Sequence, residues 1–188
     1  MTGVLLGDGF ALDADTTITP LRTETRVDQR NRFYRETDGY QSGSWFGSRS
    51  IQAQLLERAQ PTRQRIERIP ASAPGEPPVV QSSVGKPLHE VFYRDHQGQL
   101  WHTPVLHTGE RKSLDRADPQ AFSAWLNAHR AHTGPRLRMV LDRLERINGM
   151  FYADVPDADD FTIQTLPSIR WRNRAVILAG RVETQGAP

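Results

Sequence analysis

The sequence predicts an α+β fold: a mainly antiparallel sheet, two packed helices in the C-terminal half and an irregular Arg/Gly/Ser-rich N-terminal part. Three observations support this expectation. Short extended segments bounded by turn residues recur along the chain, two amphipathic helical patterns follow each other between residues 118 and 149, and five prolines lie within residues 70–88. Strands and helices that are grouped in this way are typical of α+β proteins.

The length and composition limit the class of protein. A chain of 188 residues fits one domain or at most two small ones. No apolar run approaches the ~18 residues of a membrane span, and the first residues lack the basic and apolar regions of a secretory signal. We therefore expect a cytoplasmic protein without membrane contacts. The absence of cysteine excludes disulfides, thiolate zinc sites and a cysteine nucleophile.

The N-terminal elements are expected to be short. Residues 3–21 predict strands or coil, and residues 22–50 predict mostly loop with one strand. A short helix is expected over residues 50–60, with Ile51, Leu55 and Leu56 on one face and Pro61 ending it. Residues 63–69 predict a further strand. Residues 1–69 thus form a basic, loop-rich N-terminal part, and residues 70–88 a proline-rich linker or long loop.

Residues 89–188 carry clearer patterns. Segments 90–95 and 100–106 predict a hairpin, in which Pro104 restricts the second strand to an edge or a bulge. Asp118 and Pro119 predict the start of a helix whose apolar stripe consists of Phe122, Trp125, Leu126 and His129. A second helix is expected over residues 135–148, with a stripe of Leu137, Val140, Leu141, Leu144 and Ile147. Extended segments over residues 161–166 and 171–182 complete the sheet. All three parts could also form one domain.

One glycine- and serine-rich segment is a candidate anion site. It lies directly before the expected helix, whose N-terminal amides would favour an anion. The candidate residues of this anion-binding loop are Gly43, Ser44, Gly47, Ser48 and Arg49. The alternative is a surface loop whose aromatic residues pack into the core, because neither a Walker A motif nor a dinucleotide-binding motif is present.

The arginines suggest a second function. Of 24 basic residues, 22 are arginine, and ten of these lie between Arg22 and Arg68 against six acids. Arginine binds phosphates through its planar fork and stacks on aromatic rings. In a C-terminal strand, three alternate arginines would share one face at a spacing similar to that of phosphates; a charged edge strand is the alternative explanation. The candidate nucleic-acid-binding residues are Arg26, Arg30, Arg32, Arg35, Tyr40, Arg49, Arg170, Arg172 and Arg174.

The histidines offer a weaker enzymatic hypothesis. His102 and His107 are five residues apart and point to opposite faces of a regular strand, unless Pro104 changes the alternation. His129 continues an apolar stripe, so we expect it to pack in the core. No closed metal-ligand spacing is present, and we expect neither a metal nor a cofactor. A histidine can nevertheless act as acid or base beside an arginine, and His102, His107 and Arg111 are the candidates.

The function expected from the sequence is therefore non-enzymatic binding of single-stranded RNA or DNA, within a larger nucleoprotein assembly that includes protein partners. The alternative is a small metal-independent nuclease, or another hydrolase of phosphate substrates, that uses His102 or His107. A second alternative is a protein–protein interaction subunit that binds no nucleic acid and uses the same arginines and aromatic residues as interface anchors.

Overall fold

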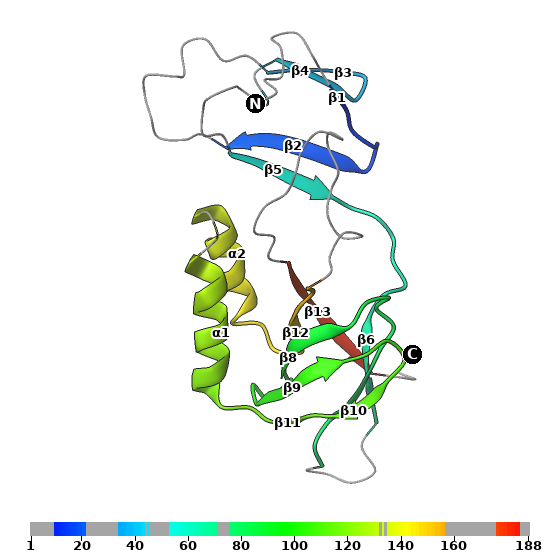
Figure 1. Cartoon of the computed structure of the whole chain (residues 1–188), viewed down its shortest axis with the longest axis vertical. Coiled ribbons are helices and arrows are strands. Elements are labelled where there is room, and N and C mark those ends of the chain that lie inside the picture. Colours follow the sequence, from blue (N-terminus) through cyan, green and yellow to red (C-terminus); the bar gives the residue numbers. More distant parts are fainter. Residues whose placement is uncertain are drawn as a thin grey trace. The chain divides into compact units, whose positions relative to one another are not determined.

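The computed structural model describes residues 10–21, 34–43, 45, 53–70, 76–131, 133, 135–156 and 176–184. The chain divides into two compact units. Unit 1 comprises Met1–Thr62 and Thr162–Arg172, and unit 2 comprises Arg63–Phe161 and Asn173–Pro188. The expected α+β class is confirmed: strands dominate both units, and two helices follow each other in the C-terminal half (Figure 1).

Unit 1 contains two small antiparallel sheets. Strands β1 (Phe10–Ala11), β4 (Tyr40–Gly43) and β3 (Tyr34–Thr37) form a three-stranded sheet in that order. Strands β2 (Thr16–Leu21) and β5 (Ala53–Arg58) form the second sheet. Of the segment before residue 22, the structure describes residues 10–21, and the expected strands are present there as β1 and β2. Residues 34–43 contain two strands, whereas we predicted one strand within residues 22–50.

The helix predicted over residues 50–60 is wrong, because the chain forms β5 there. All six residues of β5 pair with β2, and Arg58 forms ion pairs of 3.0 Å with Asp13 and 3.2 Å with Asp15. The neighbouring residues Leu55 and Leu56 point to opposite faces of this ladder and are both half-buried. Three apolar residues were too few to distinguish a helix from a strand.

Unit 2 is built on one eight-stranded sheet. The strand order is β10-β7-β6-β13-β12-β8-β9-β11, and the described pairings are antiparallel except that between β13 and β6. The bounds are β6 Ile66–Ile69, β7 Val79–Ser82, β8 Leu88–Arg94, β9 Leu100–Leu106, β10 Arg111–Ser113, β11 Asp115–Arg116, β12 Met150–Asp154 and β13 Ile177–Thr184.

The sheet is nearly closed by a single residue. Strands β10 and β11 are its two outermost strands, and only Leu114 separates them in the sequence. Leu114 is completely buried, and its N–H donates to the backbone oxygen of Pro78 over 2.9 Å. The chain therefore passes directly from β10 at one edge of the sheet to β11 at the other edge. The sheet curves so that its two edges approach each other, and it encloses its inner side chains.

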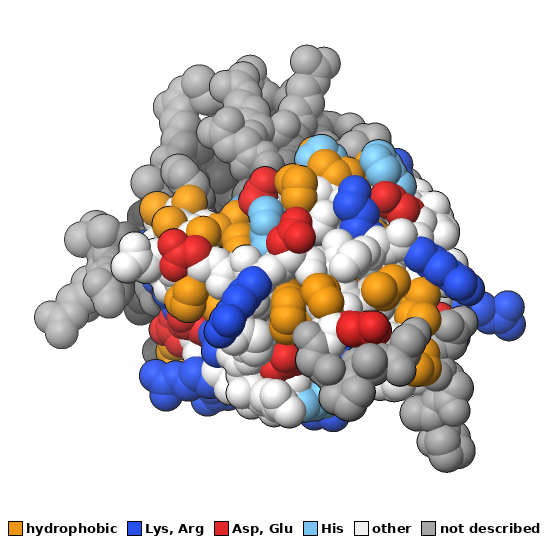
Figure 2. Space-filling model, turned by 90° about the horizontal axis from the view of Figure 1, so that it is seen from below, with side chains coloured by type: hydrophobic (Ala, Val, Ile, Leu, Met, Phe, Trp, Pro, Cys, Tyr) orange, Lys and Arg blue, Asp and Glu red, His pale blue; other side chains and the backbone are white. Residues whose placement is uncertain are grey.

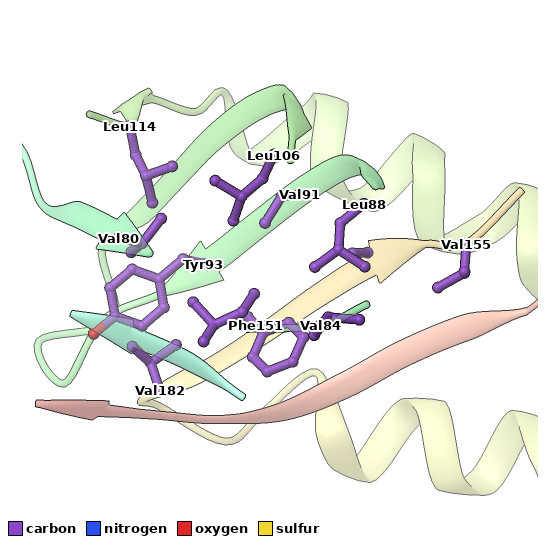
Figure 3. Close-up of a cluster of buried hydrophobic side chains, with 12 residues drawn as sticks. Val80, Val84, Leu88, Val91, Tyr93, Leu106, Leu114, Phe151, Val155 and Val182 are labelled. Carbon is purple, nitrogen blue, oxygen red and sulfur yellow. The ribbon is translucent and has the colours of Figure 1, made fainter. Parts of the chain in front are cut away.

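Twelve buried residues form an inner cluster on the concave side of the sheet (Figure 3). They are Ile66, Val80, Val84, Leu88, Val91, Tyr93, Leu106, Leu114, Phe151, Ala153, Val155 and Val182. Val80 belongs to β7, within the segment that we expected to be a linker or long loop. That expectation does not hold over Val79–Ser82, because two adjacent valines complete a strand between β6 and β10.

The predicted hairpin is confirmed as β8 and β9. Leu88, Val91 and Tyr93 of β8 all belong to the inner cluster, although residues 88 and 91 would alternate in a regular strand. The alternation changes at Glu90, which has a positive φ of 46° opposite Pro104. Only residues 101 and 102 of β9 pair with β11, so Pro104 occupies an unpaired edge, as its missing N–H requires.

Helices α1 (Pro119–Ala131) and α2 (Pro135–Leu144) cover the outer side of the sheet. The predicted cap is present: the Asp118 carboxylate accepts the Gln120 N–H over 2.9 Å. Buried residues from helices and sheet form an outer cluster of Phe92, Leu100, Ala117, Phe122, Leu126, Leu141, Met150 and Tyr152. No helix in the described parts of the chain is long and apolar enough to cross a membrane.

The second helix is shorter than predicted, and its stripe is only partly buried. It ends at Leu144 rather than at residue 148. Leu141 is buried and Leu144 half-buried, whereas Val140 is 49% exposed and Ile147 39% exposed. The helix packs on the sheet through the centre of the stripe, so the residues at its flank face away. The side chain of Leu137 lies outside the described residues.

Candidate functional site

The three-stranded sheet of unit 1 brings two predicted nucleic-acid-binding residues onto one face. In the β3–β4 ladder, Arg35 pairs with Ser42 and Thr37 pairs with Tyr40. Directly opposed residues share a face, and so do residues two positions apart on one strand. Arg35 and Tyr40 therefore lie on the same side, which we call the Tyr40 face. Both side chains are exposed, Tyr40 to 48%.

A tight turn sets this register. Asp38 and Gly39 join β3 to β4 and have positive φ angles of 50° and 77°. Two consecutive positive φ angles are typical of a type I′ turn, for which Asp-Gly is a preferred pair. The sequence analysis predicted one strand here and missed this hairpin, although the Asp-Gly dipeptide between two short polar segments was a signal for it.

The opposite face of the three-stranded sheet is covered only on its β4 side, since Tyr34 and Glu36 of β3 are exposed there. Gln41, the neighbour of Tyr40 on β4, is 2% exposed, and Trp45 is 5% exposed. The Trp45 ring meets the Tyr34 ring edge-on at 4.8 Å between centroids, and Gln54 Nε2 of β5 donates to the Trp45 backbone oxygen. The sheet is thus anchored beside β4 on this face, whereas Arg35, Thr37 and Tyr40 on the Tyr40 face are exposed.

The other predicted residues of this interface lie outside the described part of the chain: Arg26, Arg30, Arg32, Arg49, Arg170, Arg172 and Arg174. Of the anion-binding loop, Gly43 ends β4 with a φ of 105°, and Ser44, Gly47 and Ser48 are outside the description as well. Because β5 replaces the expected helix over Ala53–Arg58, the anion hypothesis loses the helical amides on which it relied there.

Acidic side chains accompany many basic ones in unit 2. Arg65 lies 2.7 Å from Glu67, and Lys112 lies 3.3 Å from Glu110. Figure 2 shows basic and acidic side chains interspersed on the face turned to the viewer, with no continuous basic area there. Within the described residues, the Tyr40 face is therefore a better candidate for nucleic-acid contacts than this face of unit 2.

His102 forms a pair with a carboxylate across the β8–β9 ladder. Its Nε2 lies 3.0 Å from Oε2 of Glu90, and its ring packs on Phe92 at 4.6 Å between centroids. Glu90 is the residue with the positive φ of 46°, a conformation that costs a non-glycine residue about 1–3 kcal/mol. A carboxylate that orients an imidazole is an arrangement found around general bases.

The other two residues of the hydrolase hypothesis lie elsewhere. His107 follows the end of β9, about 16 Å from His102 at the rise of an extended strand. Its backbone N–H donates to Glu110 over 2.9 Å, and this bond holds the pKa of the Glu110 carboxyl below its usual value. Arg111 begins β10 and donates through Nε to Gln81 over 3.3 Å. The two histidines therefore do not form one site.

A second carboxylate–histidine pair joins α1 to β12. His129 Nε2 lies 2.8 Å from Asp154 Oδ1, and Trp125 Nε1 donates to Asp154 Oδ2 over 3.0 Å. The His129 side chain is 15% exposed and its ring meets the Trp125 ring edge-on, so it packs in the core as expected. The sequence analysis missed its carboxylate partner, because Asp154 ends a strand that was not predicted.

No group of three or more potential metal-ligating side chains occurs among the residues that the structure describes. Comparisons of the chain with protein-family models, with curated proteins and with solved structures find no match.

Proposed function

We propose that the chain binds single-stranded RNA or DNA through the Tyr40 face of unit 1, as a cytoplasmic subunit of a nucleoprotein assembly. The observation that supports this proposal is the exposed Tyr40 ring on the central strand of the three-stranded sheet, with Arg35 on the adjacent strand. An exposed ring offers a base a stacking surface, and a neighbouring guanidinium offers its phosphate a charged contact.

Single strands fit this face better than a duplex. Their bases are unstacked and accessible to an aromatic side chain, whereas the bases of a duplex present only their edges in the grooves. The arginines that the sequence analysis named and that lie outside the described residues are kept as further candidates for phosphate contacts, namely Arg26, Arg30, Arg32, Arg49, Arg170, Arg172 and Arg174.

The stacking contribution is tested with Tyr40→Leu. A base stacked on an aromatic ring contributes about 1–3 kcal/mol, so affinity for a short labelled oligonucleotide is expected to fall about 5- to 150-fold. Tyr40→Phe keeps the ring and should retain most of the affinity. Fluorescence anisotropy measures both, and circular dichroism checks that the variants are folded. Equal affinities of the leucine and phenylalanine variants would contradict stacking.

The phosphate contact is tested through the salt dependence of binding. Each contact with a single strand adds about 0.7 to the slope of log affinity against log salt, so Arg35→Gln should lower the slope by that amount. Arg116→Gln is the matched control, because it removes the same charge from an exposed position in unit 2. A wild-type protein that shows no binding at low salt, or a flat slope, would contradict the proposed function.

A separate experiment tests whether the three C-terminal arginines contact phosphates. Neutralising Arg170, Arg172 and Arg174 together should lower the salt slope by roughly two to three units for every sequence tested, because phosphate contacts carry no sequence information. Unchanged binding with increased light scattering would instead favour the protected-edge explanation.

A hydrolase of phosphate substrates is the second candidate, because Glu90 lies 3.0 Å from His102 and could orient it as a general base. His102→Ala should then lower hydrolysis of an activated phosphodiester by about 10²–10⁴-fold. Activity that survives this change would exclude His102, and His107→Ala tests the remaining histidine in the same assay.

A further inference from the structure

The turn that leads into β12 contacts the hairpin turn between β8 and β9 through Asn148 and Gly149. The exposed Asn148 side chain donates from Nδ2 to the backbone oxygen of His96 over 3.3 Å. The buried Gly149 donates its backbone N–H to the oxygen of Arg94 over 2.8 Å, and its carbonyl accepts the N–H of Val182 over 2.9 Å. These bonds connect the two residues to the hairpin turn, to β8 and to β13.

Only glycine fits at position 149. Its φ angle is 75°, a conformation that residues with a side chain rarely adopt. A Cβ atom added to Gly149 would also lie 2.7 Å from Cε1 of the His96 ring, which is closer than such atoms approach in proteins. The fold therefore requires that Asn148 be followed by a residue without a side chain.

This pair of residues meets the chemical requirements for deamidation, since asparagine is one of the thermolabile residues of proteins. In that reaction the backbone nitrogen of Gly149 loses its proton and attacks Cγ of Asn148. The bond from Cγ to Nδ2 breaks, and the side-chain nitrogen takes up a proton and leaves as ammonia. Water then opens the succinimide ring and gives aspartate or isoaspartate. A side chain on the attacking residue would hinder ring closure, so glycine gives the least hindered case.

The folded turn opposes this reaction at both reacting groups. The attack needs the nitrogen of Gly149 without its proton, but this N–H is directed at the backbone oxygens of Arg94, at 2.8 Å, and Asp95, at 3.4 Å. The amide that would leave is held by its hydrogen bond to His96. Ring closure therefore requires that the contact between the two turns first open.

We propose that Asn148 is a site of spontaneous deamidation that the folded state protects, so that its conversion marks chains in which the contact between the two turns has opened. Aspartate and isoaspartate both lack the Nδ2 donor, so the hydrogen bond to His96 cannot form again and the mark is permanent. The reaction takes place in unit 2 and does not depend on nucleic-acid binding by unit 1.

The first test compares the folded and the unfolded full-length chain. Both are incubated in the same mildly alkaline buffer, one of them with guanidinium chloride above the unfolding transition, and are then digested with trypsin. The peptide that begins at Ile147 should gain one mass unit at least about tenfold faster in the unfolded chain. Equal rates in the two states, or an unfolded chain that shows no gain, would overturn the proposal.

Two controls assign the mass gain to Asn148. Asn127 is exposed on α1 and is followed by Ala128, whose side chain hinders ring closure, so its peptide should not change over the same period. Asn148→Gln keeps an amide but would have to close a larger and slower ring, so this variant should show no gain even when unfolded. A gain that persists in Asn148→Gln would place the reaction at another residue and contradict the assignment.

The second test opens the contact locally in the folded protein. Gly98 has a φ of 82° in the hairpin turn, and a Cβ added to it would lie 3.7 Å from Oδ1 of Asn148. Gly98→Ala should therefore speed deamidation about fivefold or more, the effect of a side chain in left-handed backbone. Gly109→Ala is the matched control, because Gly109 has a φ of 77° in the turn between β9 and β10, with no atom of the described residues within 4 Å of an added Cβ.

Gly109→Ala should leave the deamidation rate close to that of the wild type. Circular dichroism checks that both variants are folded under the conditions of incubation. Equal acceleration by the two substitutions would show that global unfolding exposes Asn148, and an unchanged rate in Gly98→Ala would show that the hairpin turn does not protect it. Either outcome would overturn the proposal.

Discussion

Trp125 on α1 donates its indole N–H to Asp154 at the end of β12, over 3.0 Å. Trp125→Phe keeps an aromatic ring but removes this donor, so the half-buried carboxylate loses a hydrogen bond. The free energy of unfolding is expected to fall by about 1–3 kcal/mol. Urea denaturation measures the change. In an Asp154→Ala background the same substitution should cost much less, and an equal cost in both backgrounds would contradict the role of the bond.

Arg130 connects the two helices through two carboxylates. Its Nη2 lies 2.6 Å from Asp142 and 2.6 Å from Glu145 of α2 and the turn that follows it. Arg130→Gln would leave two acidic side chains near each other without their cation, and we expect a loss of roughly 1 kcal/mol in the free energy of unfolding. Because these groups are partly exposed, the loss should shrink in high salt. A loss that is unaffected by salt would indicate packing rather than charge.

Stability should decrease at alkaline pH because of Tyr152. Burial raises the pKa of this completely buried phenol to about 12, and its hydroxyl donates to the Leu144 backbone oxygen. The unfolded chain releases this proton near pH 10, so the contribution is fully present below about pH 10 and is lost as pH rises towards 12. Two units correspond to about 2–3 kcal/mol. The difference in unfolding free energy between wild type and Tyr152→Phe, followed across this range, measures it; a constant difference would contradict the shift.

The two helices differ in which apolar residues stabilise the fold. Leu126 is fully buried in the outer cluster, so Leu126→Ala should cost about 2–5 kcal/mol. Val140 is 49% exposed, and Val140→Ala should stay within roughly 0.5 kcal/mol. Thermal denaturation distinguishes them. Comparable losses from both substitutions would mean that Val140 is covered in solution.

The parts of the fold that depend on local interactions could be predicted from the sequence. The cap at Asp118 and the hairpin of β8 and β9 are each set by residues close in the chain. Strand β12 was missed because Met150–Asp154 is a short apolar run buried on both faces, without the polar alternation that identifies a half-exposed strand. Strand β5 was mistaken for a helix because its partner β2 is distant in sequence.

The candidate sites show the same limit. Arg35 and Tyr40 could be named as residue types suited to nucleic acid, but their common face follows from a register that the Asp38–Gly39 turn sets. Asp154 and His129 meet only because the end of β12 lies beside α1. Such contacts between distant segments depend on tertiary structure and leave no local pattern.

The position of Leu114 has a consequence for how the molecule behaves among its own copies. Outermost strands normally offer unpaired amides and carbonyls on which another chain can add a strand. Here the single residue Leu114, whose side chain is buried, links the outermost strands β10 and β11, so that the two edges of the sheet are held close to each other. Leu114→Gly would loosen both rims at once, so the first sign of damage should be concentration-dependent oligomers, detectable by size-exclusion chromatography at temperatures below the unfolding transition.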